Sequence, residues 1–263
     1  MGLFAVLLRD PRGAEFPLVS KILGDFLNVP AIDAQHKARD AWGFLGEKLS
    51  AEEAQRLAAG AQAAGAPARV VPDSELAVSP PSQSANGGGP ENDVLRLTLG
   101  LPAREKRIPL VDLTLIAILP FREESTSTVI LKEGPSAGER AAKMTLLMTT
   151  GIPLPMGKST EIKKTLTTGD LTVFADLFTA TERFRVDAGH FGFSGLGESK
   201  TWNGLENLKR FIKIILERRP DVPLNRGARW VMENKTLATA GYSDRGQFEK
   251  ECRWLLTLAR LPR

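Results

Sequence analysis

The chain has 263 residues, of which 42% are hydrophobic and 25% are charged, and its formal net charge at pH 7 is +4. This composition is typical of a soluble globular protein that is large enough for one or two domains. Two histidines and one cysteine exclude a four-ligand zinc site of the Cys/His kind and an internal disulfide. We therefore expect neither a metal site nor a cofactor.

The N-terminus, MGLFAVLLRD, has an apolar run of eight residues before Arg9 and Asp10. The run is too short to span a membrane, and it lacks the basic start and the small-residue cleavage site of a signal peptide. We expect a cytoplasmic protein with no membrane span.

Residues 1–76 show the pattern of a small α/β domain. LFAVLLRD predicts a buried strand, the apolar spacing in FPLVSKILGDFLN predicts a helix, and IDAQHKARDAW predicts a shorter one. Ser50 and Glu53 form a capping box at the start of an alanine-rich helix that Gly65 can end. ARVV then returns as a strand, with room for a small strand near GFLGEKL. The expected order is β-α-α-α-β, or βααβαβ with the small strand.

This region, over residues 1–74, resembles the C-terminal domain of the bacterial ribosomal stalk protein. The resemblance implies a small α/β interaction domain of the adaptor type. The family's domain recruits translation factors with a lysine-rich first helix, whereas VSKILGDF offers only Lys21. The family's dimerisation region and hinge are also missing, so the resemblance implies a fold and not that function. The stretch that carries it includes Glu47, Lys48, Leu49, Ser50, Glu52, Glu53, Ala54, Leu57, Ala64, Gly65, Val70 and Val71.

A flexible linker is predicted over residues 77–93. SPPSQSANGGGPEND combines two adjacent prolines, three adjacent glycines and small polar residues without apolar periodicity. Such a composition is typical of a tether. We therefore expect residues 1–76 and 94–263 to fold as independent domains.

Residues 94–263 predict an α+β domain, with a β-rich part over 94–200 that helices over 201–263 close. The alternation in DVLRLTLG predicts a half-buried strand, and RIPLVDLTLIAI resembles a stretch of bacterial pleckstrin-homology-like barrels, which implies an antiparallel barrel. A hairpin is expected over 170–191. Helices are expected in TWNGLENLKRFIKIILERRP, over 225–234 and over 244–260, with Trp202 and Trp230 in the core.

GIPLPMGKST, residues 151–160, ends like the phosphate-binding loop of nucleotide hydrolases but fails as one. The pattern G-x-x-x-x-G-K-[ST] requires glycine where Ile152 stands, and Pro153 and Pro155 remove backbone donors. A predicted helix, SAGERAAKMTLLMTT, also precedes the loop, whereas a phosphate-binding loop precedes its helix. GHFGFSGLGESK likewise fails as a nucleophile elbow, since Leu196 replaces the glycine of G-x-S-x-G.

The positive charge is uneven along the chain. Residues 1–100 hold 9 Lys/Arg and 12 Asp/Glu, a net −3, and residues 101–263 hold 26 and 19, a net +7. In RFRV the strand period turns Phe184 and Val186 to the core and leaves the arginines outward. The candidate anion-binding residues are Arg183, Arg185, Lys209, Arg210 and Lys213.

Three function classes follow from these patterns. The first is a non-enzymatic interaction or adaptor protein whose partner is another protein. The alternative is binding of an anionic partner, either lipid head groups or nucleic acid, through the basic second domain. The third is an enzyme, for which Asp176, Asp187 and Glu198 are scattered acidic candidates and Cys252, on an apolar helix face, is expected to be buried and inert.

Overall fold

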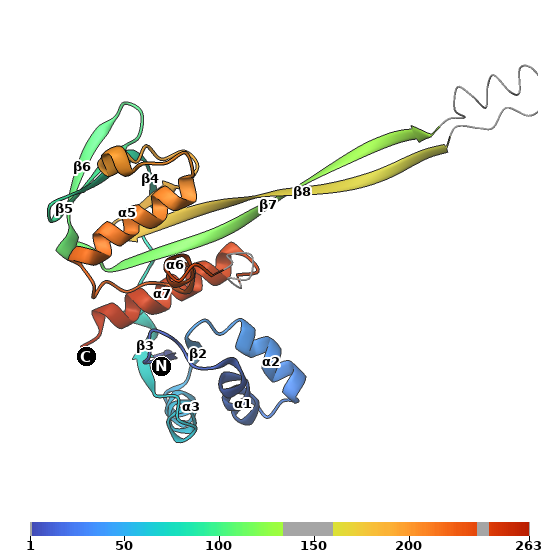
Figure 1. Ribbon diagram of the computed structural model, residues 1–263. Coiled ribbons are helices and arrows are strands. Elements are labelled where there is room, and N and C mark those ends of the chain that lie inside the picture. Colours follow the sequence, from blue (N-terminus) through green and yellow to red (C-terminus); the bar gives the residue numbers. More distant parts are fainter. Residues whose placement is uncertain (1, 134–159, 236–241, 263) are drawn as a thin grey trace, which may run out of the picture. The chain divides into compact units, whose positions relative to one another are not determined.

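The structure is a computed structural model that describes residues 2–133, 160–235 and 242–262. Its contacts divide the chain into two compact units, one formed by Met1–Phe121 with Thr172–Arg263 and the other by Arg122–Leu171. The second unit contains the later part of strand β7 (Leu115–Glu133) and the earlier part of strand β8 (Thr160–Phe178), which are neighbours in one sheet (Figure 1). The predicted helix over 136–150 and nearly all of the loop over 151–160 lie outside the described residues.

The N-terminal region of the first unit has the predicted order of elements. Its three-stranded sheet has the order β2-β1-β3, and β1 pairs antiparallel with both neighbours. The capping box of Ser50 and Glu53 is present, and Gly65 follows the capped helix with a φ of 86°. The elements are β1 (Phe4–Leu8), α1 (Phe16–Leu27), α2 (Ala31–Arg39), β2 (Phe44–Leu49), α3 (Ala51–Ala63) and β3 (Ala68–Pro72).

The larger sheet is mixed and open, with the strand order β6-β5-β4-β9-β8-β7. Strand β4 pairs antiparallel with β5 but parallel with β9, and β6 and β7 are the two edges. The predicted antiparallel, pleckstrin-homology-like barrel is therefore wrong, whereas the hairpin of β8 and β9 is confirmed. The remaining strands are β4 (Ser82–Glu91), β5 (Val94–Leu99), β6 (Arg104–Pro109) and β9 (Arg183–Asp187).

Strand β4 corrects the prediction of a flexible linker over 77–93. Residues 82–91 are an interior strand, paired with β9 over Ser82–Ala85 and with β5 over Ala85–Glu91. The glycines serve close approach rather than flexibility, because a Cβ on Gly89 would lie 2.4 Å from the Cα of Gly195. The boundaries of the two compact units likewise fall at 121/122 and 171/172 of the sequence and not within this segment.

Both faces of the larger sheet are covered within the first unit. Along β7, Leu115 and Ala117 belong to a core shared with the N-terminal sheet and helix α7 (Arg245–Arg260), whereas Ile116 and Ile118 belong to a core shared with helix α5 (Gly204–Arg218). Figure 1 shows α7 between the two sheets. Burial on both faces explains why LIAIL, residues 115–119, is a continuous apolar run.

The C-terminal helices begin at side-chain caps. Asn203 caps α5, Asn225 caps α6 (Arg226–Met232) and Asp244 caps α7, each by accepting a backbone N–H three residues on. Because α5 starts after Trp202, that side chain is 96% exposed, and the prediction that it lies in the core is wrong. The described ranges also contain the short 3-10 helices η1 (Asp73–Glu75), η2 (Leu110–Asp112) and η3 (Ser194–Ser199).

The close packing of β4 against η3 predicts opposite effects for two glycine-to-alanine substitutions. Gly89→Ala forces a methyl group onto the backbone of Gly195 and should lower the free energy of unfolding by roughly 1–3 kcal/mol. The control Gly60→Ala, on α3, meets nothing within 4 Å and should raise it by about 0.5–1 kcal/mol. Urea unfolding measures both, and a neutral Gly89→Ala would contradict the packing.

Strand β4 also predicts where protease does not cut first. Because residues 82–91 are paired along their length with either β9 or β5, we expect limited proteolysis to begin elsewhere in the native protein. The early fragments are identified by mass spectrometry. Early fragments that end within residues 82–91 would contradict this expectation and support the flexible linker predicted from the sequence.

Candidate functional site: an arginine-lined cleft

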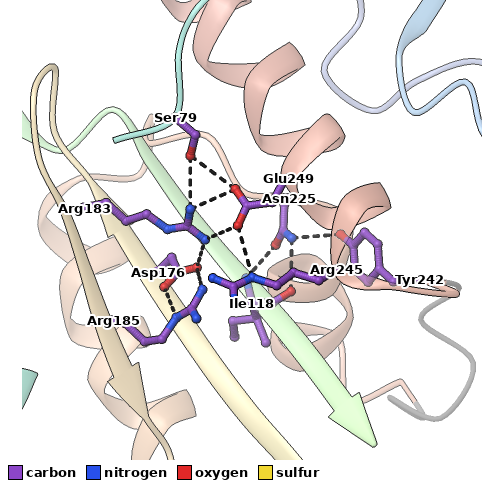
Figure 2. A network of polar contacts seen from close by, with 9 residues as sticks. All are labelled: Ser79, Ile118, Asp176, Arg183, Arg185, Asn225, Tyr242, Arg245 and Glu249. Carbon is purple, nitrogen blue, oxygen red and sulfur yellow. Dashed lines mark hydrogen bonds and ion pairs between the residues drawn. The ribbon is translucent and has the colours of Figure 1, made fainter. Parts of the chain in front are cut away.

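The structure places Arg183 and Arg185 in a polar network between the larger sheet and α7 (Figure 2). Arg183 is 3% exposed, and its Nη2 donates to Asp176 Oδ2 at 2.6 Å and to Glu249 Oε1 at 2.8 Å. Its Nη1 donates to Glu249 and to Ser79 Oγ, and Arg185 makes two further bonds to Asp176. The prediction that Arg183 faces outward is wrong, because α7 covers that face of β9.

The other predicted anion-binding residues lie on α5, which packs against the opposite face of the larger sheet. Lys209 Nζ donates to Asn234 Oδ1, Arg210 Nη1 donates to the Ser199 carbonyl, and Lys213 is exposed. The alternation of β9 places the two arginines of that strand away from α5. The five residues therefore do not form one site.

The acidic candidates and Cys252 have separate surroundings. Asp176 lies in the network above, Asp187 accepts from the Gly189 N–H and lies 2.9 Å from His190 Nδ1, and Glu198 is exposed on η3. Cys252 is fully buried, as predicted, and burial raises the pKa of its thiol. Within the described ranges, no group of three His, Cys, Asp or Glu side chains is placed to hold a metal ion.

A cleft of about 210 Å³ lies between the β1–α1 loop, the end of α2, and helices α6 and α7. We call it the arginine cleft. Four arginines line it together with one carboxylate and two tryptophan rings, so that cationic side chains outnumber anionic ones by four to one. These residues are Arg12, Arg39, Arg226, Arg229, Glu251, Trp42 and Trp254.

The wall of the arginine cleft is built around a left-handed pair, Trp42 and Gly43, with φ values of 45° and 86°. A Cβ on Gly43 would lie 1.9 Å from the ring of Trp254, so only glycine admits that ring. Trp254 Nε1 donates to the Leu8 carbonyl at 2.9 Å. These contacts fix α7 against β1 and hold the cleft in shape.

Aromatic stacking positions one of the four arginines. Trp42 stacks on Tyr242 with ring centroids 4.7 Å apart, and the Arg226 guanidinium lies 4.5 Å from the centroid of a Trp42 ring. This cation–π contact orients Arg226 without consuming its hydrogen-bond donors. The Trp42 Nε1 donor is buried and has no hydrogen-bond partner in the described part of the chain.

Glu251 is the only carboxylate that lines the arginine cleft in the described structure. It is 2% exposed, and it accepts from the Tyr242 hydroxyl and from the Arg226 N–H at 3.0 Å. Arg229 Nη2 lies 3.9 Å from it. Burial raises the pKa of Glu251, although these donors and cations oppose the rise.

The remaining charge of the cleft is positive and accessible. No hydrogen bond to a carboxylate is found, in the described structure, for the side chains of Arg12, Arg39 and Arg226, all of which are exposed. Arg229 instead donates to the Pro11 and Leu224 carbonyls. Guanidinium groups bind carboxylate and phosphate oxygens through paired donors. The arrangement is suited to holding an anionic group.

None of the four arginines was singled out by the sequence patterns. The one local signal is NRGARW, where Arg226 and Arg229 are three residues apart and so share a helix face. Arg12 and Arg39 come from other elements, and only the packing of α2 and α6 around the β1–α1 loop brings them to the same cleft.

Comparison with known proteins gives no match to a family model, a curated protein or a solved structure. The resemblance of residues 1–74 to the ribosomal stalk domain therefore stays a prediction. In the described residues, no helix combines the length and the apolar character that crossing a membrane requires.

The burial of Glu251 predicts a pH-dependent stability difference from Glu251→Gln. The folded-state pKa is raised above the ordinary value of 4.5, so the unfolded chain ionises first as the pH rises. The wild type should lose stability relative to the variant from about pH 4.5 until the pH passes the folded-state pKa. Urea unfolding at pH 4 to 8 measures this, and a constant difference would contradict it.

Proposed function

We propose that this protein is a non-enzymatic interaction protein that binds an acidic segment of another protein in the arginine cleft. The observation that carries the proposal is the convergence of Arg12, Arg39 and Arg226 on one cleft, where their side chains make no hydrogen bond or salt bridge to a carboxylate in the described structure. Because the Trp42 ring already orients the Arg226 guanidinium, that group needs little ordering when a ligand binds.

The size of the cleft supports a single acidic group as its occupant. At about 210 Å³ it is smaller than the usual range of roughly 300–1,000 Å³ for small-molecule sites. That space suits an acidic side chain or a terminal carboxylate. Phe16 lines the rim and is 41% exposed, which offers an apolar contact to the rest of a peptide.

The alternative partners, lipid head groups and nucleic acid, fit this geometry less well. Both present phosphates over an extended surface and are bound by cations spread along it. The arginine cleft instead gathers its cations in one hollow, and the five basic residues predicted from sequence are divided between α5 and a buried network. Binding of an acidic peptide and binding of lipid head groups or nucleic acid should both weaken with salt. Salt dependence therefore does not distinguish the partners, and each kind of partner must be tested directly.

The proposal predicts that a fluorescent octaglutamate peptide binds the protein and that arginine variants weaken it. Arg39→Ala and Arg226→Ala should each raise the dissociation constant about 5- to 30-fold, since each removes a charged hydrogen-bond donor. The control Arg104→Ala removes an exposed charge on β6, away from the cleft, and should change binding little. Fluorescence anisotropy at low and high salt measures all four proteins.

Three outcomes would overturn the proposal. The first is absence of peptide binding at low salt by a folded protein. The second is an equal loss of affinity in Arg104→Ala, which would indicate a response to total charge alone. The third is binding of an oligonucleotide or of anionic vesicles that exceeds peptide binding and is insensitive to the cleft variants, which would favour the alternative class.

A further inference from the structure

A second cleft lies on the other side of the β1–α1 loop. Pro11 lines this cleft, whereas Arg12, the next residue, lines the arginine cleft. Its volume is about 560 Å³, within the usual range for small-molecule sites. It is bounded by the loop, β3, the segments before β7 and after α5, and the end of α7. We call it the apolar cleft.

The floor of the apolar cleft is aliphatic. Leu255 and Leu258 lie three residues apart on α7, so their side chains are neighbours on one helix face. Leu113 adds to the floor from the segment before β7, and Leu113 and Leu255 are each only 2% exposed. Val111, at the edge, is 71% exposed. Because Leu113 and Leu255 are already buried, the apolar surface that water still reaches in the cleft is that of Val111 and of the half-buried Leu258 and Leu261. An apolar body that removes this surface from water gains free energy.

The floor has few hydrogen-bonding groups to offer a polar ligand. The Thr114 hydroxyl, the one uncharged polar side chain among its described lining residues, donates to the Phe178 carbonyl. A peptide backbone laid along this floor would lose hydrogen bonds to water without replacing them. The ligand body should therefore be a hydrocarbon rather than a polypeptide.

The charged residues that line the apolar cleft are three arginines, Arg9, Arg69 and Arg219, and one carboxylate, Asp221. Arg69 Nη1 donates to the Pro262 carbonyl, and Arg219 is engaged by Asp221 and by the Leu110 carbonyl. The side chain of Arg9 is exposed and has no hydrogen bond or ion pair in the described structure. Its guanidinium is thus available to an anion at the mouth of the cleft, with Arg69 on the neighbouring strand.

From these observations we infer that the apolar cleft binds an aliphatic carboxylate, with the hydrocarbon chain on the leucine floor and the carboxylate at Arg9. A carboxylate matches the paired donors of a guanidinium, and the hydrocarbon chain matches a floor without free donors. The site is distinct from the arginine cleft and does not depend on the function proposed for it.

Isothermal titration with decanoate, 1-decanol and acetate tests the inference on the full chain. Decanoate should bind, decanol should bind at least ten-fold more weakly, and acetate should give no measurable heat. Arg9→Gln should weaken decanoate binding about ten-fold and leave decanol binding unchanged. Leu258→Ala should weaken both, with its fold checked by thermal melting.

Arg39→Ala, in the arginine cleft, is the matched control, and it should leave decanoate binding unchanged while it weakens octaglutamate binding. The two proposals can therefore fail separately. Equal affinity for decanoate and decanol, or decanoate binding that Arg9→Gln does not weaken, would overturn the assignment of the carboxylate. No decanoate binding by the folded wild type would overturn the site itself.

Discussion

The buried contact of Arg183 with Asp176 and Glu249 holds the layers of the first unit together. One guanidinium joins β9, β8 and α7, and it also reaches Ser79 ahead of β4 (Figure 2). A charge buried this deeply must be paired, because removal of one partner of a buried ion pair costs on the order of 3–5 kcal/mol. The contact therefore fixes the position of α7 on the sheet.

The position of α7 in turn decides where both clefts lie. Its Trp254 binds the carbonyl of Leu8 and packs on Gly43, which places the helix against the N-terminal sheet. One part of α7 supplies Glu251 to the arginine cleft, and its last turns supply Leu255 and Leu258 to the apolar cleft. Both clefts are thus products of packing between the two ends of the chain.

Arginine has two different roles in this protein, and the difference is one of surroundings. Arg183 and Arg185 share Asp176, and Arg183 has Glu249 as well, so their charge is neutralised within the fold. Arg39 and Arg226 lie exposed at a cleft whose one carboxylate in the described structure, Glu251, is buried and accepts from the Tyr242 hydroxyl and from the backbone N–H of Arg226. Only the exposed arginines of the cleft can therefore attract an anionic partner electrostatically.

The sequence by itself determined the features that depend on near neighbours. The capping box at Ser50, the hairpin of β8 and β9, the helix boundary at Asp244 and the buried Cys252 were all predictable, since helix caps and apolar periodicity act over a few residues. The order of elements in the N-terminal region followed from the same local signals.

Tertiary structure decided what those signals could not. Gly87 and Gly89 looked like part of a tether because the backbone that they contact, at Gly192 and Gly195, is remote in sequence. Arg183 looked solvated because its partner Glu249 is 66 residues away on the helix that covers it. The period of a strand shows which side chains share a face, but elements distant in sequence decide whether that face is buried. Packing of distant elements likewise brings the arginines of three elements into one cleft.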